Sequence, residues 1–484
     1  MDKSSIIFGN PIDAKTLQKA ERSKQKFLKK FGDDTQKVYH LGLSPISQID
    51  EIRMQNLVLA DKPLVLPDNP LIVGNIRMGF GHYRISMAIA SCAQAMGYSP
   101  VWFDLASFDA TGSAMIRSQN DLYSLGSRIS QKSRLFNRFV WEPINSEGFK
   151  KITYNASDQK NAELLVPLYR DLPKDVPFVA THVWPSQGAV HAGLTHVVNA
   201  VPDNWPMGLH LSEGALHAVQ TPFAYLGYKS LNGFAKEPLK HMPDDALFEV
   251  GHFVDHELTA NIEKDCEARI ERQKSGAPVR FLLTVGGAGA GADLYIDMVR
   301  HLLGYVKQKK AEIIINFGDH LDMWELFRKK IPGIEQLTET YFNDYASFHD
   351  FAARLPDDGA RKFGGDTGIA AVCNKDIFEA VYSTNLLMRS CDVLVTKPGE
   401  LVFYPVPKLF MRHIGGHEVY GALHAQEIGD ATNECRTSGS ICAMIDTLIG
   451  DRQILIHMSQ RIMELKEYGI YNGGYEVVKL AAGK

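Results

Sequence analysis

The fold of this chain is decided by two glycine-rich turns, Gly79-Phe80-Gly81-His82 and Gly286-Gly287-Ala288-Gly289-Ala290-Gly291. The first turn follows the apolar run Pro70 to Gly74, and the second follows the run Phe281 to Val285. A glycine turn between a strand and a helix lets backbone N–H groups and the helix N-terminus approach an anion. Two such turns predict two nucleotide-type α/β domains that face one cleft.

The residues after the first turn have the pattern of a parallel sheet. A helix is predicted over Tyr83 to Met96, with Gly97 as its C-cap, and a strand over Pro100 to Leu105. A strand, a helix and a further strand in this order form a βαβ unit, whose two strands are parallel.

Two later apolar runs, Pro177 to Ala180 and Thr195 to Val201, extend the same sheet, and polar residues follow each of them. In parallel α/β sheets, ligands bind at the carboxyl ends of the strands. We therefore expect His82, His182 and Asp203 to converge at that edge. For His182, and for His252 further along, the alternative is a satisfied loop or core histidine.

The second half of the chain repeats the pattern. A charged helix over Glu257 to Lys274 is predicted to link the two domains. After the second glycine turn, strands are predicted over Glu312 to Phe317 and over Val393 to Thr396, and the latter leads into Lys397-Pro398-Gly399-Glu400. The polar stretch Asn343 to Thr367 receives no assignment.

Length and composition limit the function classes. A chain of 484 residues, 45% hydrophobic and 22% charged, exceeds one core of ordinary size, so at least two domains are expected. The net charge of −4 and the absence of any recognised module argue against nucleic acid as a partner. The six cysteines form no C-x-x-C pair, which argues against a zinc module and a disulfide framework and favours a reducing compartment.

The sequence also predicts where the protein resides. The N-terminus lacks the basic and then apolar pattern of a secretory signal, and no apolar stretch approaches the roughly 18 residues that a spanning helix needs. We expect a cytoplasmic protein, with peripheral binding to the inner face of the membrane as an extension of that location.

Four segments in the right order resemble a known family. They are Gly79-Phe80-Gly81-His82, Val250-Gly251-His252-Phe253-Val254, Leu282-Leu283-Thr284-Val285-Gly286-Gly287 and Cys391-Asp392-Val393-Leu394-Val395-Thr396-Lys397-Pro398-Gly399. Together they are similar to the GT-B glycosyltransferases. Within that family they resemble the branch of the peptidoglycan lipid-precursor N-acetylglucosaminyltransferase and monogalactosyldiacylglycerol synthase. The likeness runs from Pro70 to Ile449.

The resemblance implies an α/β fold with two Rossmann-like domains facing a central cleft, the first for the acceptor and the second for the nucleotide-sugar. The expected parts are an N-terminal extension with a lysine-rich helix (1–65), the acceptor domain (66–256), a linker (257–278), the donor domain (279–450) and a C-terminal helical segment packing back on the first domain (451–484). No metal and no cofactor is implied. The donor substrate is a nucleoside-diphosphate sugar, with UDP-sugar preferred.

The resemblance also assigns roles to residues. By position, His82 in the turn of Gly79 and Gly81 lies near the transferred sugar and is a candidate base. The donor phosphates lie against Gly286, Gly287 and Gly289. Independently of the family, sugar transfer needs donors for a departing diphosphate and a base for the acceptor hydroxyl, and histidine suits the second task near neutral pH. Asp203 is the second candidate base. A structural histidine and a tightly packed turn are the alternatives.

One segment on the donor side departs from the family. Relatives place a ribose-binding glutamate in a short helix after a glycine pair, whereas the segment from Gly399 to Pro407 is shorter here and Tyr404 occupies the corresponding place. Glu400 is a candidate for the ribose role or for a helix cap, and Lys397 and Gly399 are further donor-side candidates. Glu418, in the loop expected to close on the sugar, is either a donor ligand or a surface carboxylate.

A basic and aromatic stretch in the first half is a candidate membrane contact. Its residues are Arg134, Phe136, Arg138, Phe139 and Trp141. Such a mixture suits an anionic lipid interface, but it equally fits an amphipathic helix whose apolar face belongs to the core.

These observations predict a metal-independent, inverting glycosyltransferase that moves a sugar from a nucleotide-sugar to an acceptor hydroxyl on a lipid or a small molecule. A GT-B sugar-nucleotide epimerase is the alternative within enzymes. A non-catalytic sugar-nucleotide-binding protein that has lost the donor site is the alternative outside them, motivated by the short segment from Gly399 to Pro407. A dehydrogenase is disfavoured, since neither turn has G-x-G-x-x-G spacing followed by an acidic residue.

Overall fold

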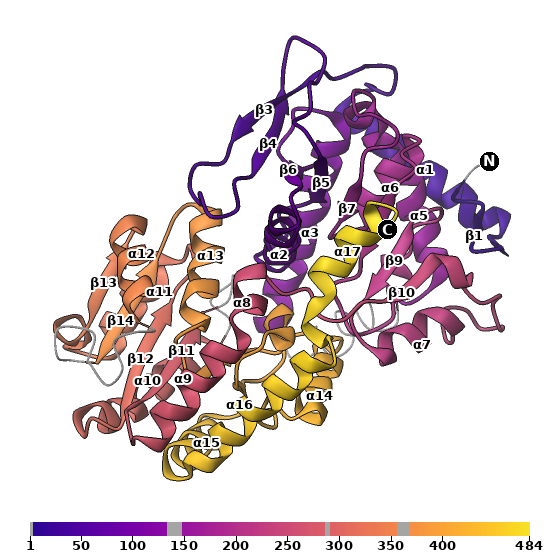
Figure 1. The fold of residues 1–484 in the computed structure, drawn as a ribbon. Helices are drawn as coiled ribbons and strands as arrows, with labels where there is room; N and C mark the ends of the chain where they lie inside the picture. Colours follow the sequence, from indigo (N-terminus) through magenta and orange to yellow (C-terminus); the bar gives the residue numbers. More distant parts are fainter. Residues whose placement is uncertain (1–2, 133–147, 286–290, 356–367) are drawn as a thin grey trace. The chain divides into compact units, whose positions relative to one another are not determined.

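The computed structural model describes residues 3–132, 148–285, 291–355 and 368–484 (Figure 1). The chain divides into two compact units. The first comprises residues 1–254, 415–417 and 472–484, and the second comprises residues 255–414 and 418–471. Each unit contains a sheet of mainly or wholly parallel strands with helices packed against it. The predicted α/β class with two Rossmann-like units is confirmed.

The sheet of the first unit has eight strands in the order β10-β9-β8-β7-β5-β6-β4-β3, and only the β3–β4 pair is antiparallel. The strands are β3 (Leu41–Pro45), β4 (Gln55–Leu59), β5 (Pro70–Asn75), β6 (Ser99–Asp104), β7 (Phe178–Ala180), β8 (Val197–Ala200), β9 (Leu216–Val219) and β10 (Leu247–Glu249). A short hairpin, β1 (Ile6–Ile7) and β2 (Asn10–Pro11), precedes them.

Helices flank this sheet (Figure 1). They are α1 (Ala14–Phe31), α2 (Gly81–Ala95), α3 (Thr111–Lys132), α5 (Ile152–Ala162), α6 (Val183–His191), α7 (Pro222–Ser230) and α17 (Gly473–Ala481), with the 3₁₀ helices η3 (Glu163–Tyr169), η4 (Gly208–His210) and η5 (Asp244–Ala246). Helix α1 forms in the lysine-rich stretch where the sequence predicted a helix.

Close packing explains why glycine occupies two positions in this unit. A Cβ atom on Gly74 of β5 would lie 2.4 Å from the ring of Phe178 on β7. A Cβ atom on Gly474 of α17 would lie 2.7 Å from the Sγ atom of Cys92 on α2. Helix α17, at the end of the chain, therefore lies directly on the helix that follows the first glycine turn.

The second unit has six strands, all parallel, in the order β13-β14-β12-β11-β15-β16. The strands are β11 (Val279–Thr284), β12 (Ala311–Asn316), β13 (Glu339–Phe342), β14 (Ile369–Cys373), β15 (Val393–Thr396) and β16 (Lys408–Phe410). Its α-helices are α8 (His256–Ala260), α9 (Ile262–Lys274), α10 (Ala292–Lys307), α11 (Leu321–Lys330), α12 (Tyr345–Arg354), α13 (Ile377–Met388), α14 (Glu418–Ile428), α15 (Ser438–Gly450) and α16 (Arg452–Glu467). Strand β11 is buried along its whole length, as a doubly covered parallel strand requires.

Two segments differ from the sequence prediction. The helix expected over 257–274 is divided into α8 and α9 at Asn261, whose backbone leaves the helical region (φ −109°, ψ 9°) and whose side-chain amide donates to the carbonyl of Glu257 at 2.7 Å. Part of the unassigned stretch forms α12, which begins where the Asp344 carboxylate accepts a hydrogen bond from the Ser347 N–H.

Two further observations concern the whole chain. All six cysteines are free thiols, and five of them are buried. Within the described ranges, no helix combines the length and the apolar character that crossing a membrane would need.

Candidate functional site

His82 lies at the carboxyl edge of the first sheet, in the first turn of α2 after β5. Its Nδ1 atom is 2.7 Å from the carbonyl oxygen of Thr181, which follows β7. Because a carbonyl can only accept, Nδ1 carries the proton and donates to it. In the neutral ring the lone pair is then on Nε2, which is the atom that can take a proton.

His182 lies beside His82. The two rings pack edge to face with centroids 4.9 Å apart. His182 is the N-cap of α6, and its Nδ1 atom accepts a hydrogen bond from the Trp184 N–H at 3.2 Å. Burial, together with the charges of His82 and His210, lowers the pKa of His182 well below its ordinary value. His182 is therefore a neutral, buried neighbour of His82.

Asp203 lies in the loop after β8 and contacts a histidine that the sequence analysis did not single out. One Asp203 carboxylate oxygen is 3.3 Å from the Nε2 atom of His210, which is on η4. Burial alone would raise the pKa of the Asp203 carboxyl, but the hydrogen bond from His210, and the positive charge that His417, His210 and His82 carry when protonated, outweigh it and hold that pKa below its usual range. Asp203 is thus a carboxylate at neutral pH.

The predicted convergence of His82, His182 and Asp203 is confirmed, because all three follow neighbouring strands of one sheet and interact electrostatically. Two residues of this site, His210 and Tyr228, were not predicted from the sequence, and the Tyr228 hydroxyl lies 2.8 Å from the His210 Nδ1 atom. Neither residue ends a strand or belongs to a motif, so no local signal could have identified them. His252 is fully buried, as its core alternative required.

In the second unit, Lys397 and Glu418 form an ion pair at the carboxyl edge of β15. The Lys397 Nζ atom is 2.5 Å from the Glu418 Oε1 atom, and the Ile414 N–H donates to Oε2 at 2.7 Å. A Cβ atom on Gly399 would lie 3.3 Å from the Lys397 ammonium and 3.6 Å from Glu418. The structure therefore brings these three donor-side candidates together.

The glycine turn of the second unit is only partly described. Gly286, Gly287 and Gly289 lie outside the described residues. On either side of them, Thr284 ends β11, and Gly291 adopts a left-handed conformation (φ +83°) as the N-cap of α10. Strand β11 pairs with β15, and Lys397 is the residue that directly follows β15.

The departure from the family at Tyr404 has a structural role. Tyr404 is fully buried, and its hydroxyl donates to the Asp255 carboxylate at 2.9 Å, while the Asn385 amide donates to the other Asp255 oxygen at 2.8 Å. Tyr404 is therefore part of a buried hydrogen-bond network. Glu400 begins the 3₁₀ helix η7 (Glu400–Phe403), where either of its predicted roles remains a prediction.

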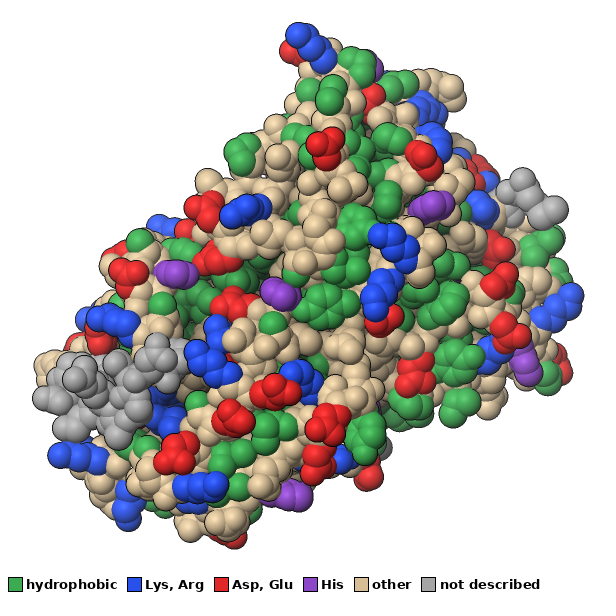
Figure 2. All heavy atoms as spheres, in the orientation of Figure 1, with side chains coloured by type: hydrophobic (Ala, Val, Ile, Leu, Met, Phe, Trp, Pro, Cys, Tyr) green, Lys and Arg blue, Asp and Glu red, His purple; other side chains and the backbone are tan. Residues whose placement is uncertain are grey.

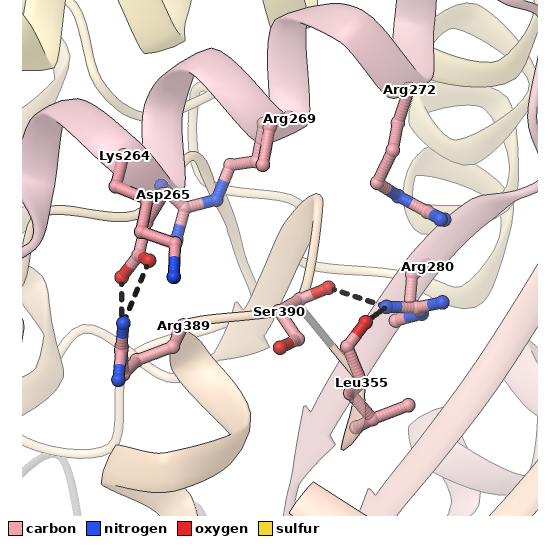
Figure 3. A pocket seen from close by; sticks show the side chains of 9 residues that line it. Lys264, Asp265, Arg269, Arg272, Arg280, Leu355, Arg389 and Ser390 are labelled. Atoms are coloured by element: carbon pink, nitrogen blue, oxygen red, sulfur yellow. Dashed lines mark hydrogen bonds and ion pairs between the residues drawn. The ribbon is translucent and has the colours of Figure 1, made fainter. Parts of the chain in front are cut away.

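A small cavity of about 30 Å³ lies at the opposite, amino edge of the second sheet (Figure 3). Its lining includes Arg269 and Arg272 of α9, Arg280 of β11, and Arg389 with Ser390 after α13. The guanidinium groups bind carboxylates and carbonyls, as in the Arg280–Glu312 pair at 2.9 Å. This cluster is an internal clamp between α9 and the starts of the strands.

Arg134, Phe136, Arg138, Phe139 and Trp141, the predicted membrane contact, lie outside the described residues. On the described part of α3, however, Leu122, Leu125 and Ile129 are exposed at helical spacing. Charges of both signs are interspersed over the face shown in Figure 2. In the described ranges, no group of three or more His, Cys, Asp or Glu side chains could hold a metal ion.

Comparisons with known proteins give the following matches. Residues 6–230 match a family model described as a domain of unknown function (DUF6937), and residues 242–482 match a second one (DUF6938). No curated protein matches the chain.

Several solved structures are similar in fold. They include a UDP-GlcNAc 2-epimerase from Neisseria meningitidis bound to UDP-GlcNAc (11% identity, 86% of this chain and 100% of that chain, TM-score 0.45). A glycosyltransferase from Rickettsia africae (10% identity, 86% and 99%, TM-score 0.40) and an α,α-trehalose 6-phosphate synthase from Burkholderia multivorans (9% identity, 86% and 99%, TM-score 0.42) are two others.

Proposed function

We propose that this protein is a GT-B-type, inverting glycosyltransferase that moves a sugar from a nucleoside-diphosphate sugar, with UDP-sugar preferred, to an acceptor hydroxyl. The observation that carries the proposal is the state of His82. Its Nδ1–H is committed to the Thr181 carbonyl, so Nε2 is the basic atom, and it lies at the sheet edge where α/β folds bind ligands.

The reaction is a direct displacement at the anomeric carbon. The His82 Nε2 atom takes the proton of the acceptor hydroxyl while the oxygen attacks, and the bond from the anomeric carbon to the diphosphate breaks with inversion. The buried neighbour His182 supports this role, since it stays neutral and does not repel the imidazolium that forms on His82. The ionised Asp203 stabilises that imidazolium electrostatically.

The donor side of the proposal depends on the second unit. A departing diphosphate needs positive charge and N–H donors. Lys397, beside Gly399, supplies the charge, and the glycine turn between β11 and α10 supplies main-chain amides. In this scheme protein groups, without a metal ion, neutralise the leaving group.

For the acceptor we propose an apolar portion, as on a lipid. Two residues after Asp203, the Trp205 ring stacks on Phe223 of α7 at 6.4 Å, and Phe223 and Leu226 are 43% and 66% exposed. These side chains, with the exposed leucines of α3, offer apolar surface to an acyl chain or a cytoplasmic membrane face. The stretch from Arg134 to Trp141, which follows α3 in the sequence, is proposed as the membrane contact.

An epimerase is the second candidate, because one observation favours it. Sugar-nucleotide epimerisation needs several acid and base groups around one sugar, and His82, His182, His210 and Asp203 lie at one sheet edge. Unlike a transferase, an epimerase would interconvert two nucleotide-sugars without any acceptor.

The test is an assay of the full-length protein with a panel of nucleoside-diphosphate sugars, with and without alcohol and glycolipid acceptors. We expect UDP release that depends on an acceptor, and a loss of roughly 10²- to 10⁴-fold in kcat for His82→Gln. His301→Gln, which removes a partly exposed histidine of the second unit, is the matched control. Interconversion without acceptor would establish the epimerase, and the absence of any thermal shift with nucleotides would establish a non-catalytic protein that has lost the donor site.

A further inference from the structure

Three side chains of the first unit form a chain of contacts that ends at Asp203. The Tyr228 hydroxyl lies 2.8 Å from the His210 Nδ1 atom, and the His210 Nε2 atom lies 3.3 Å from the Asp203 Oδ2 atom. Tyr228 is fully buried and His210 is 5% exposed, whereas the Asp203 side chain is 34% exposed. These three side chains, called the relay below, thus extend from the core of the unit to its surface.

The hydrogen-bond partners of Tyr228 and His210 determine which of their atoms carry protons. The Tyr228 oxygen accepts the Met207 N–H at 3.2 Å, so its own proton needs an acceptor. Among the described residues that acceptor is the His210 Nδ1 atom. His210 is then the neutral tautomer with its proton on Nε2, and this proton points to the Asp203 carboxylate. The reverse tautomer would place a lone pair against a carboxylate and leave the buried Tyr228 proton without an acceptor.

The backbone holds His210 in this position. The His210 carbonyl accepts a hydrogen bond from the buried Asn199 side chain at 2.6 Å, and Asn199 is part of β8. Helix α7 carries Tyr228 and begins at the N-cap Thr221, whose hydroxyl accepts the Ala224 N–H at 3.1 Å. A side chain of β8 therefore fixes His210, and Tyr228 lies on a capped helix of the same unit.

We propose that Tyr228 and His210 are positioning residues, which hold the Asp203 carboxylate ionised and oriented at the carboxyl edge beside His82. This inference rests on the proposed function, and it assigns different roles to the two candidate bases, His82 and Asp203. His82 accepts the proton, and Asp203 serves as its counter-charge. The groups that face Asp203 are His82, His182, His210 and His417.

The first arm of the test needs no activity. In full-length protein carrying ¹⁵N-labelled histidine, two-bond ¹H–¹⁵N correlations report the tautomer of each ring, and His210→Gln identifies the His210 signals. We expect the Nε2–H tautomer pattern for His210, and its loss in Tyr228→Phe. Tyr169→Phe, which removes another buried hydroxyl of the same unit, is the matched control and leaves the His210 signals unchanged. An Nδ1–H pattern for His210, or His210 signals that do not change in Tyr228→Phe, would contradict the proposed role of Tyr228.

The second arm measures the consequence for His82. Asp203→Asn removes the counter-charge, so the pKa of His82 followed in the same spectra falls, and the acidic limb of the pH–rate profile moves to lower pH. Tyr228→Phe lowers kcat by roughly tenfold without changing KM, a loss at the lower end of those seen for general-base groups. An unchanged His82 titration in Asp203→Asn would refute the counter-charge role. If no substrate is ever turned over, the proposed function fails while the tautomer result still decides the relay.

Discussion

Two clusters of ionisable side chains, one in each unit, differ in the kinds of group that compose them. At the carboxyl edge of the first sheet, His82 and His182 pack ring against ring, and the Asp203 carboxylate is a third exposed with His210 as its partner. At the amino edge of the second sheet, Arg280 and Glu312 are almost fully buried and bind each other at 2.9 Å. The first cluster consists of imidazole rings and one partly exposed carboxylate, and the second of buried guanidinium groups and the carboxylates that bind them.

The kinds of group in the two clusters suit different roles, a ligand site in the first unit and a structural clamp in the second. In the second cluster, Arg269 donates to the carbonyls of Cys391 and Met388, and Arg272 binds Asp392. These contacts hold α9 against the starts of the strands. The histidine cluster holds a proton acceptor, a neutral neighbour and a carboxylate at a sheet edge that binds ligands in α/β folds. Chemistry is therefore expected at the first cluster and stability at the second.

Replacing Arg280 by leucine is the strongest test of this contrast. It leaves the Glu312 carboxylate, 3% exposed, without its nearest cation. We expect a loss of roughly 3–5 kcal/mol in the free energy of unfolding, because the buried carboxylate keeps only the more distant Arg272, at 3.7 Å, and a poorly compensated buried charge is costly. Urea unfolding of the full chain measures it.

The double variant Arg280→Leu/Glu312→Leu is the control for that experiment. Replacing both members of a buried pair by apolar residues is often close to neutral, so it should recover most of the lost stability. If the double variant is as unstable as the single one, packing rather than charge explains the effect. If the single variant keeps full stability, the cluster is no clamp.

A second prediction concerns pH and the interior of the first unit. Asp158 on α5 is 3% exposed, and burial raises its pKa to about 7. A raised carboxyl pKa means that the folded state binds the proton more tightly than the unfolded state does, so stability falls as pH rises from about 4 to about 7. Between pH 5 and pH 8 this contribution is roughly 2–3 kcal/mol.

Asp158→Asn removes this dependence. The difference in unfolding free energy between variant and wild type should therefore favour the variant more at pH 8 than at pH 5. Asp322→Asn, which changes an exposed carboxylate of the second unit, is the matched control. Equal differences at both pH values would show that Asp158 ionises in the folded protein as readily as in the unfolded one.

The fold was predictable because strand and helix patterns are local. The runs around Pro70 and Phe281 became β5 and β11, and Val393–Thr396 became β15 with the predicted bounds. Glycine turns and buried apolar runs are encoded in short stretches of sequence. The break at Asn261 was not predictable, since it depends on one side-chain hydrogen bond that competes with the helix.

The candidate site was predictable only where residues follow strands. His82, His182 and Asp203 were found because strand ends in a parallel sheet meet at one edge. His210 and Tyr228 escaped because their importance comes from a tertiary contact between η4 and α7. The burial of Tyr404 on Asp255 likewise depends on residues 149 positions apart, which no local pattern encodes.

The smallest expected effect tests whether the second unit also has a site at its carboxyl edge. Lys397 is 36% exposed and its pair with Glu418 lies over Gly399, so it can be either a surface ion pair or a phosphate ligand. Lys397→Met should weaken UDP binding by roughly tenfold, or about 1.4 kcal/mol, measured by calorimetry. Stability should change by less than about 1 kcal/mol because the pair is partly exposed. Lys466→Met removes a lysine of similar exposure, which pairs with the exposed Glu263, and should bind UDP like the wild type. If Lys397→Met also binds UDP as tightly as the wild type does, the Lys397–Glu418 pair is structural, like the arginine cluster. Both edges of the second sheet would then differ from the carboxyl edge of the first sheet, where chemistry is expected.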